Sequence, residues 1–115
     1  MVKLLEDKVV VITGASGGIG GEVALLAAEY GAKVVATYHT HRKRAEKLVK
    51  LSAEKNTPIT VAKLDVTDGD EVKRFFKKLG KTYGQLDTLL NVAGHSDRDV
   101  WFSTLENLDG EKWLD

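Results

Sequence analysis

The stretch Val9–Gly21, VVVITGASGGIGG, joins a continuous apolar run to a loop that is rich in glycine. The run Val9-Val10-Val11-Ile12 is β-branched throughout and predicts a strand that is buried on both faces, as strands of parallel sheets are. Five of the eleven glycines of the chain fall between Gly14 and Gly21. A buried strand, a tight glycine turn and a helix form the opening unit of an α/β protein with a parallel sheet.

The rest of the chain repeats this alternation. A helix with Ile19, Val23, Leu26, Ala27 and Tyr30 at helical spacing is expected to end at Gly31. Strands are predicted at Lys33–Thr37, Ile59–Leu64 and Leu86–Asn91, and a charged helix from about His41 to Lys55. Regular β-α-β alternation predicts a four-stranded parallel sheet with helices on both faces, and right-handed crossovers predict the strand order 3-2-1-4.

Two of the helices show a buried face in their sequence. The first is marked by Ala45, Leu48, Val49 and Ser52, and the second by an apolar stripe at Val72, Phe75, Phe76, Leu79 and Tyr83. Thr67, with Asp70 three positions later, predicts a capping box at the start of the second of these helices, and Gly84 is expected to end it.

Composition restricts the class of protein. The 115 residues predict one domain over residues 1–115. The 17 basic and 17 acidic side chains balance to a net charge of zero, which argues against a dedicated nucleic-acid binder. There is no cysteine, so a disulfide scaffold and thiolate zinc sites are excluded. No apolar run approaches the roughly 20 residues that span a bilayer. The charged first eight residues are not expected to act as a signal peptide, and a cytoplasmic protein that binds no membrane is expected.

The glycine loop fits two catalytic motifs. Gly14-Ala15-Ser16-Gly17-Gly18 matches the G-x-S-x-G nucleophile elbow of esterases, for which Asp65 and His95 would have to supply the acid and the base. No oxyanion loop precedes Ser16, however. The same letters fit a dinucleotide-binding loop, whose glycines let the backbone approach a pyrophosphate at a helix N-terminus. A position between a buried strand and an amphipathic helix favours the dinucleotide motif over both the elbow and a tight turn without a ligand.

Three motifs in order resemble the short-chain dehydrogenase/reductase family. Thr13–Gly20 matches its Thr-Gly-x-x-x-Gly-x-Gly cofactor loop, and Leu64-Asp65-Val66 matches its Asp-Val step after the third strand. Asn91-Val92-Ala93-Gly94 matches its Asn-Asn-Ala-Gly motif, with Val92 in place of the second asparagine. The resemblance covers nearly the whole chain, in the manner of 3-oxoacyl reductases. It implies a Rossmann-like half-domain, the cofactor-binding half of such an enzyme.

The resemblance also implies a set of site residues. Asp65 would contact the adenine ring, although it could be only a loop and cap residue. Asn91 could be only a polar bridge that holds the sheet. The expected cofactor-binding residues are Gly14, Ser16, Gly18, Ile19, Gly20, Tyr38, His39, Arg42, Asp65, Val66, Asn91, Ala93 and Gly94.

The choice of dinucleotide depends on the end of the second strand. An NAD site usually has a carboxylate there for the ribose 2′-hydroxyl. No acidic residue lies between Glu29 and Glu46, and His39, Thr40 and Arg42 could bind a 2′-phosphate instead. NADP is therefore the expected cofactor, with NAD as the second choice. The alternative is that the basic run from Arg42 is only a solvated helix start.

In the family, a serine and a Tyr-x-x-x-Lys pair carry out the chemistry, in a segment that would follow Asp115. No tyrosine of this chain has a lysine four positions later, neither Tyr30, Tyr38 nor Tyr83. We therefore expect a truncated unit that binds NADP(H) and has no catalytic residues of its own. Two alternatives remain. The chain could be part of an active NADP-dependent carbonyl reductase completed by another chain or segment, or a structural or engineered Rossmann unit that uses no cofactor.

A partner is also expected. In the strand order 3-2-1-4 the fourth strand lies at an edge, with Leu89 and Leu90 beside unpaired backbone groups. Trp101, Phe102 and Trp113 follow in a tail that has little of its own to bury them. These features predict a two-fold symmetric homodimer. The alternative is a tail that folds back over this edge within one chain.

Overall fold

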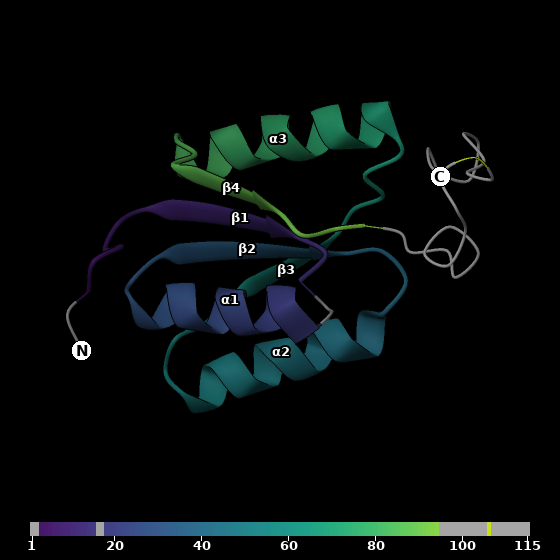
Figure 1. The fold of residues 1–115 in the computed structure, drawn as a ribbon. Helices are drawn as coiled ribbons and strands as arrows, with labels where there is room; N and C mark the ends of the chain where they lie inside the picture. Colours follow the sequence, from purple (N-terminus) through teal and green to yellow (C-terminus); the bar gives the residue numbers. More distant parts are fainter. Residues whose placement is uncertain (1–2, 16–17, 95–105, 107–115) are drawn as a thin grey trace.

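The computed structural model describes residues 3–15 and 18–94 together with Glu106. Its elements alternate strictly along the chain (Figure 1): β1 Val9–Thr13, α1 Gly18–Glu29, β2 Lys33–Tyr38, α2 Arg42–Glu54, β3 Thr60–Lys63, α3 Gly69–Tyr83 and β4 Thr88–Asn91. All strand pairs are parallel, and the order in the sheet is β3-β2-β1-β4, which confirms the predicted topology.

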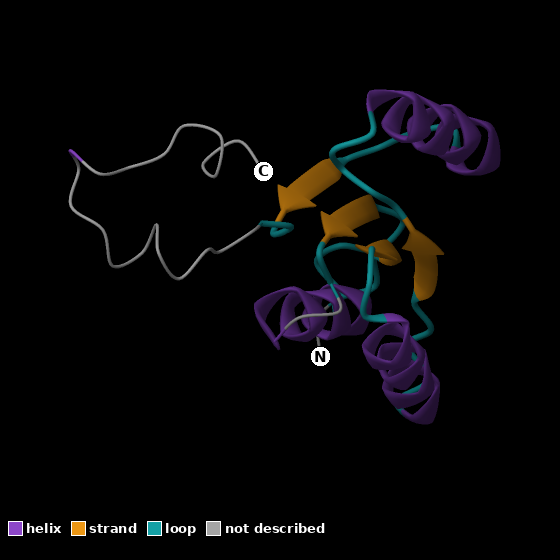
Figure 2. Cartoon of the chain, turned by 90° about the vertical axis from the view of Figure 1, so that its right-hand side faces the viewer, coloured by secondary structure: helices purple, strands orange, loops and turns teal. Residues whose placement is uncertain are grey.

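The sheet forms the middle of three layers. Helices α1 and α2 cover one face and α3 covers the other (Figures 1 and 2). Alternate residues of β1 therefore enter different cores. Val10 and Ile12 pack with the α1 side, whereas Val11 packs with Leu79 of α3. The apolar stripe predicted for α3 is confirmed from Phe75 onward, because Phe75, Phe76 and Tyr83 lie against the same small core as Leu79.

The buried face of α1 differs from the predicted one. Its buried side chains are Ala24, Leu25, Ala27 and Ala28, whereas two residues of the predicted stripe, Ile19 and Leu26, are exposed. The helix is apolar around most of its circumference, so apolarity could not identify the inward face. The side facing the sheet is the one with alanines, whose small side chains let the helix lie close to the strands.

The sequence predicted Thr67 as the N-cap of α3, and this prediction is wrong by one residue. Asp68 is the N-cap of α3, and its carboxylate accepts hydrogen bonds from the backbone N–H groups of Asp70 and Glu71. The Thr67 hydroxyl instead donates to Asp65 at 2.6 Å. The predicted end of the helix is confirmed, since Gly84 has the left-handed conformation that favours glycine, with φ of +72°.

The outer strands are shorter than their apolar runs. β3 omits Ile59 and Leu64, and β4 begins only at Thr88. Among the described residues β4 pairs only with β1, and Leu86 and Leu89 are each 41% exposed beside it. The homodimer stays a prediction. The aromatic tail that was expected to contribute to it, and His95, lie outside the described residues. No helix in the described ranges has the length and apolarity needed to cross a membrane.

The start of β4 depends on a side chain. The Asp87 carboxylate accepts the backbone N–H of Val9 at 2.8 Å, and its own N–H donates to the carbonyl of Val9 at 3.0 Å. The N–H of Val9 and, less strongly, the Gln85 amide hold the pKa of Asp87 below its ordinary value of 3.8. The carboxylate therefore contributes stability that is complete above that value and is lost as the pH falls through the lower, folded-state pKa.

Acid should consequently weaken the fold in part through Asp87. As the pH is lowered below about 4, we expect the urea concentration at the midpoint of unfolding to decrease. Asp87→Asn should make this decrease smaller. Glu54→Gln is the matched control, because Glu54 is exposed and makes no hydrogen bond or ion pair with the described residues. Urea titrations followed by circular dichroism from pH 3 to 7 measure the effect. Equal pH profiles for the two variants would show that the Asp87 contact does not contribute.

Candidate functional site

The residues predicted to form a site follow the carboxyl ends of the four strands. Because the strands are parallel, these ends lie at one edge of the sheet, which faces the viewer in Figure 2. From β1 the chain leaves toward the α1 face, whereas β4 is reached from α3 on the opposite face. The direction of the connections thus reverses between β1 and β4. In open α/β sheets, ligands bind at this kind of switch point.

Gly14 brings the loop after β1 against the segment after β4. Its φ is +70°, and a Cβ atom there would lie 2.6 Å from the Cα and 2.7 Å from the N of Ala93. Gly20 has a similar role inside the loop, since a Cβ would come within 2.6 Å of the carbonyl oxygen of Gly14. Real Cβ atoms do not approach backbone so closely, so the fold itself requires glycine at both positions.

Gly18 is different, because nothing in the described structure requires a glycine there. It is the first residue of α1 and is exposed, and a Cβ atom would meet no heavy atom within 4 Å. The first turn of a helix has backbone N–H groups without partners in the helix. A glycine at this end leaves them accessible to a large anion. Ile19 follows with 75% of its surface exposed, whereas Ser16, and with it the serine-elbow motif, lies outside the described residues.

A buried threonine holds the ends of β1 and β4 together. The hydroxyl of Thr13 donates to Oδ1 of Asn91 at 3.5 Å and accepts the N–H of Ala93 at 3.3 Å. The N–H of Val92 donates to the carbonyl of Thr13 at 3.2 Å. Asn91 therefore takes part in a polar bridge, the alternative that the sequence left open for it. This bridge places the backbone of Ala93 and Gly94 beside the glycine loop.

A carboxylate follows β3. Asp65 accepts the hydroxyl and the N–H of Thr67 at 2.6 and 2.9 Å, and its Oδ2 lies 3.7 Å from Nε2 of His39. The hydrogen bonds of Thr67, and less strongly the charge of His39, hold the pKa of Asp65 below its ordinary value. Asp65 is therefore an ionised, partly exposed acceptor, with the exposed Val66 beside it. The structure brings His39 and Asp65, predicted separately, together at one point.

Basic side chains lie between the second strand and the first turns of α2. Tyr38, which ends β2, is half-buried. Arg42 begins α2 and forms an exposed ion pair with Glu46 at 3.2 Å. Arg44 and Lys47 line a hollow of about 340 Å³ between α1 and α2 that also includes Gly18. Lys47 was not among the predicted site residues. Its place one residue before Leu48, which is buried, could have indicated that it lies near α1.

The chain matches known proteins along most of its length. The family model described as short chain dehydrogenase matches residues 8–115. A 3-oxoacyl-[acyl-carrier-protein] reductase FabG of Staphylococcus aureus is 38% identical over 87 residues, which cover 76% of this chain and 35% of that protein. A short-chain type dehydrogenase/reductase of Picea abies is 34% identical over 115 residues, which cover 95% of this chain and 42% of that protein.

A solved structure shares the fold. The short-chain dehydrogenase/reductase from Serratia marcescens BCRC 10948 superposes with a TM-score of 0.81 at 26% identity, over 96% of this chain and 43% of that one. This chain thus spans less than half the length of each of these proteins.

Proposed function

Because the chain belongs to the short-chain dehydrogenase/reductase family, we propose that it binds NADP(H) at the loop between β1 and α1. The pyrophosphate would lie at the N-terminus of α1, and the adenosine would extend toward the ends of β2 and β3. When bound, the dinucleotide supplies a hydride. The protein to which this chain contributes its nucleotide site would use that hydride for reversible transfer between NADP(H) and a carbonyl or alcohol.

The single observation that carries this proposal is the open backbone at Gly18. Packing explains the glycines at positions 14 and 20, but the described residues leave the space beside Gly18 empty. A glycine that the described packing does not require, at the start of a helix and at the switch point of the sheet, suits the close approach of a phosphate group. The residues present therefore fit the pyrophosphate of a dinucleotide.

The segment that follows β2 in the chain supports the phosphorylated dinucleotide. The first acidic residue after this strand is Glu46, and its carboxylate is paired with Arg42. The segment from His39 to Ala45 contains no carboxylate, so none of its side chains would repel a 2′-phosphate. His39, Arg42 and Arg44 follow β2 within six residues, and a guanidinium binds a phosphate through paired hydrogen bonds.

Calorimetric titration of the purified chain tests the proposal. We expect NADPH to bind about tenfold more tightly than NADH, because charge-assisted hydrogen bonds contribute roughly 1.5–3 kcal/mol. Arg42→Gln should remove most of this preference, whereas Lys50→Gln, on the same helix but near its other end, should keep it. Equal affinities for the two dinucleotides would contradict the assignment of NADP. If neither NADPH nor NADH gave a measurable heat of binding, the proposed dinucleotide site would be contradicted.

A further inference from the structure

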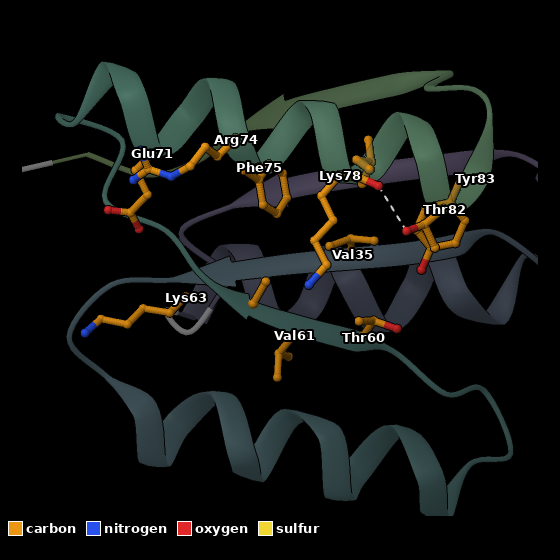
Figure 3. A pocket seen from close by; sticks show the side chains of 12 residues that line it. Val35, Thr60, Val61, Lys63, Glu71, Arg74, Phe75, Lys78, Thr82 and Tyr83 are labelled. Atoms are coloured by element: carbon orange, nitrogen blue, oxygen red, sulfur yellow. Dashed lines mark hydrogen bonds between the residues drawn. The ribbon is translucent and has the colours of Figure 1, made fainter.

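A second hollow lies on the opposite face of the sheet, away from the glycine loop. It is a groove of about 570 Å³ between α3 and strands β2 and β3 (Figure 3). Val35 of β2 and Thr60 and Ala62 of β3 line it from the sheet, and Phe75 reaches into it from α3. Tyr83 lies toward one end. The volume and apolar lining are those of a pocket for a small ligand.

Three cations line this groove without partners. Lys63, Arg74 and Lys78 form no ion pair within the described residues. In Figure 3 the Lys78 side chain extends from α3 toward the strands across the apolar floor. Glu71 is the one carboxylate among the lining residues, and its Oε1 already accepts the N–H of Asp65 at 3.1 Å. The groove therefore combines an apolar floor with an excess of positive charge.

The arrangement on α3 has a cost within the chain. Arg74 and Lys78 are four residues apart and therefore neighbours on the helix surface, where like charges destabilise a helix by a few tenths of a kcal/mol. Each would gain from an anion between them. The helix rises about 14 Å from Arg74 to Tyr83, so an extended tail could lie along it from the cations to the aromatic end.

We propose that this groove binds an amphiphilic anion, a medium-chain aliphatic carboxylate. Its carboxylate would pair with Lys78 and Arg74, and its tail would lie against Val35, Phe75 and Tyr83. Charge complementarity selects an anionic head, and the apolar floor selects a tail over a purely polar acid. The groove lies on the face opposite α1, so this inference does not depend on the proposed dinucleotide site.

Titration of the full chain with dodecanoate, below the concentration at which it forms micelles, tests the proposal. Backbone amide chemical shifts should change at the groove residues, and calorimetry should show a saturable event. Dodecyltrimethylammonium, with the same tail and the opposite charge, and acetate, with no tail, should each bind at least about tenfold more weakly. Equal binding of the two surfactants, shifts spread over the whole chain, or a loss of helical circular dichroism on addition would overturn the proposal. Binding of an acidic peptide to the groove, without binding of dodecanoate, would also overturn the proposal.

A charge reversal separates the groove from general surface charge. Lys78→Glu should weaken dodecanoate binding about tenfold, since it replaces an attraction by a repulsion. Lys77→Glu is the matched control, because Lys77 is the exposed neighbour on the same helix and does not line the groove. Both variants should bind NADPH as the parent chain does, which keeps the two proposals distinguishable. Equal losses in the two variants would overturn the groove as the site.

Discussion

Replacing Gly14 by alanine is expected to lower the free energy of unfolding by about 3–5 kcal/mol, a large part of the roughly 5–15 kcal/mol available to a domain. Two effects act at this position. The backbone has a φ of +70°, and the new methyl carbon would lie 2.6 Å from the Cα of Ala93. That neighbour is backbone, tied to Thr13 by a hydrogen bond, and cannot rotate away as a flexible side chain could. Urea denaturation followed by circular dichroism measures the loss.

Gly84 offers a control that separates these two effects. It has nearly the same φ, +72°, but a Cβ atom there would meet nothing within 4 Å. Gly84→Ala should therefore cost only the backbone strain, about 1–2 kcal/mol. If Gly14→Ala were no more harmful than Gly84→Ala, the close contact between the glycine loop and the segment after β4 would not contribute to stability.

Replacing Gly18 by leucine is expected to abolish dinucleotide binding while the fold remains. The described structure leaves room for the side chain, so the free energy of unfolding should change by less than about 0.5 kcal/mol. The same side chain would occupy the space in which a phosphate must approach the first turn of α1. Affinity for NADPH should fall at least about a hundredfold. Calorimetry on the variant, beside its circular dichroism spectrum, tests both parts.

Gly69→Leu is the matched control for this variant. Gly69 also begins a helix, α3, and also has nothing within 4 Å of a Cβ atom, but it lies outside the glycine loop. It should leave NADPH binding unchanged. Equal heats from the Gly18 variant and the parent chain would remove the proposed site from this loop, even if the chain bound the dinucleotide elsewhere.

Apolar patterns in the sequence predicted every described helix and strand, and the handedness of the crossovers predicted the order of the strands. These patterns did not predict the details that depend on packing. The apolar residues of α1 are spread around the helix, so the choice of Ala24 and Ala28 for the sheet side, with Leu26 left exposed, is decided by the distance between layers. Likewise, Thr67 and Asp68 can both cap a helix. The contact of Thr67 with Asp65 decides between them, and it forms only in the folded chain.

For the site, the glycine motif predicted the loop and its place at the strand ends. The motif could not distinguish Gly14, which the packing requires, from Gly18, beside which the described residues leave space. That distinction depends on contact with Ala93, about 80 residues away. The groove beside α3 had no sequence signal. Its cations come from β3 and from two turns of α3, and only the fold places these segments beside one groove.

The central position of β1 has a consequence for biosynthesis. This strand is made first, and β2 can pair with it soon afterward, but its other edge must wait for β4. Val9 and Thr13 bond to residues 78 positions further along the chain. At roughly 5–20 residues per second, translation from Tyr38 to Asn91 takes about 3–10 s. For that interval the apolar strand VVVIT has one unpaired edge, and at this stage the nascent chain is most open to capture by another unfolded chain or by a chaperone.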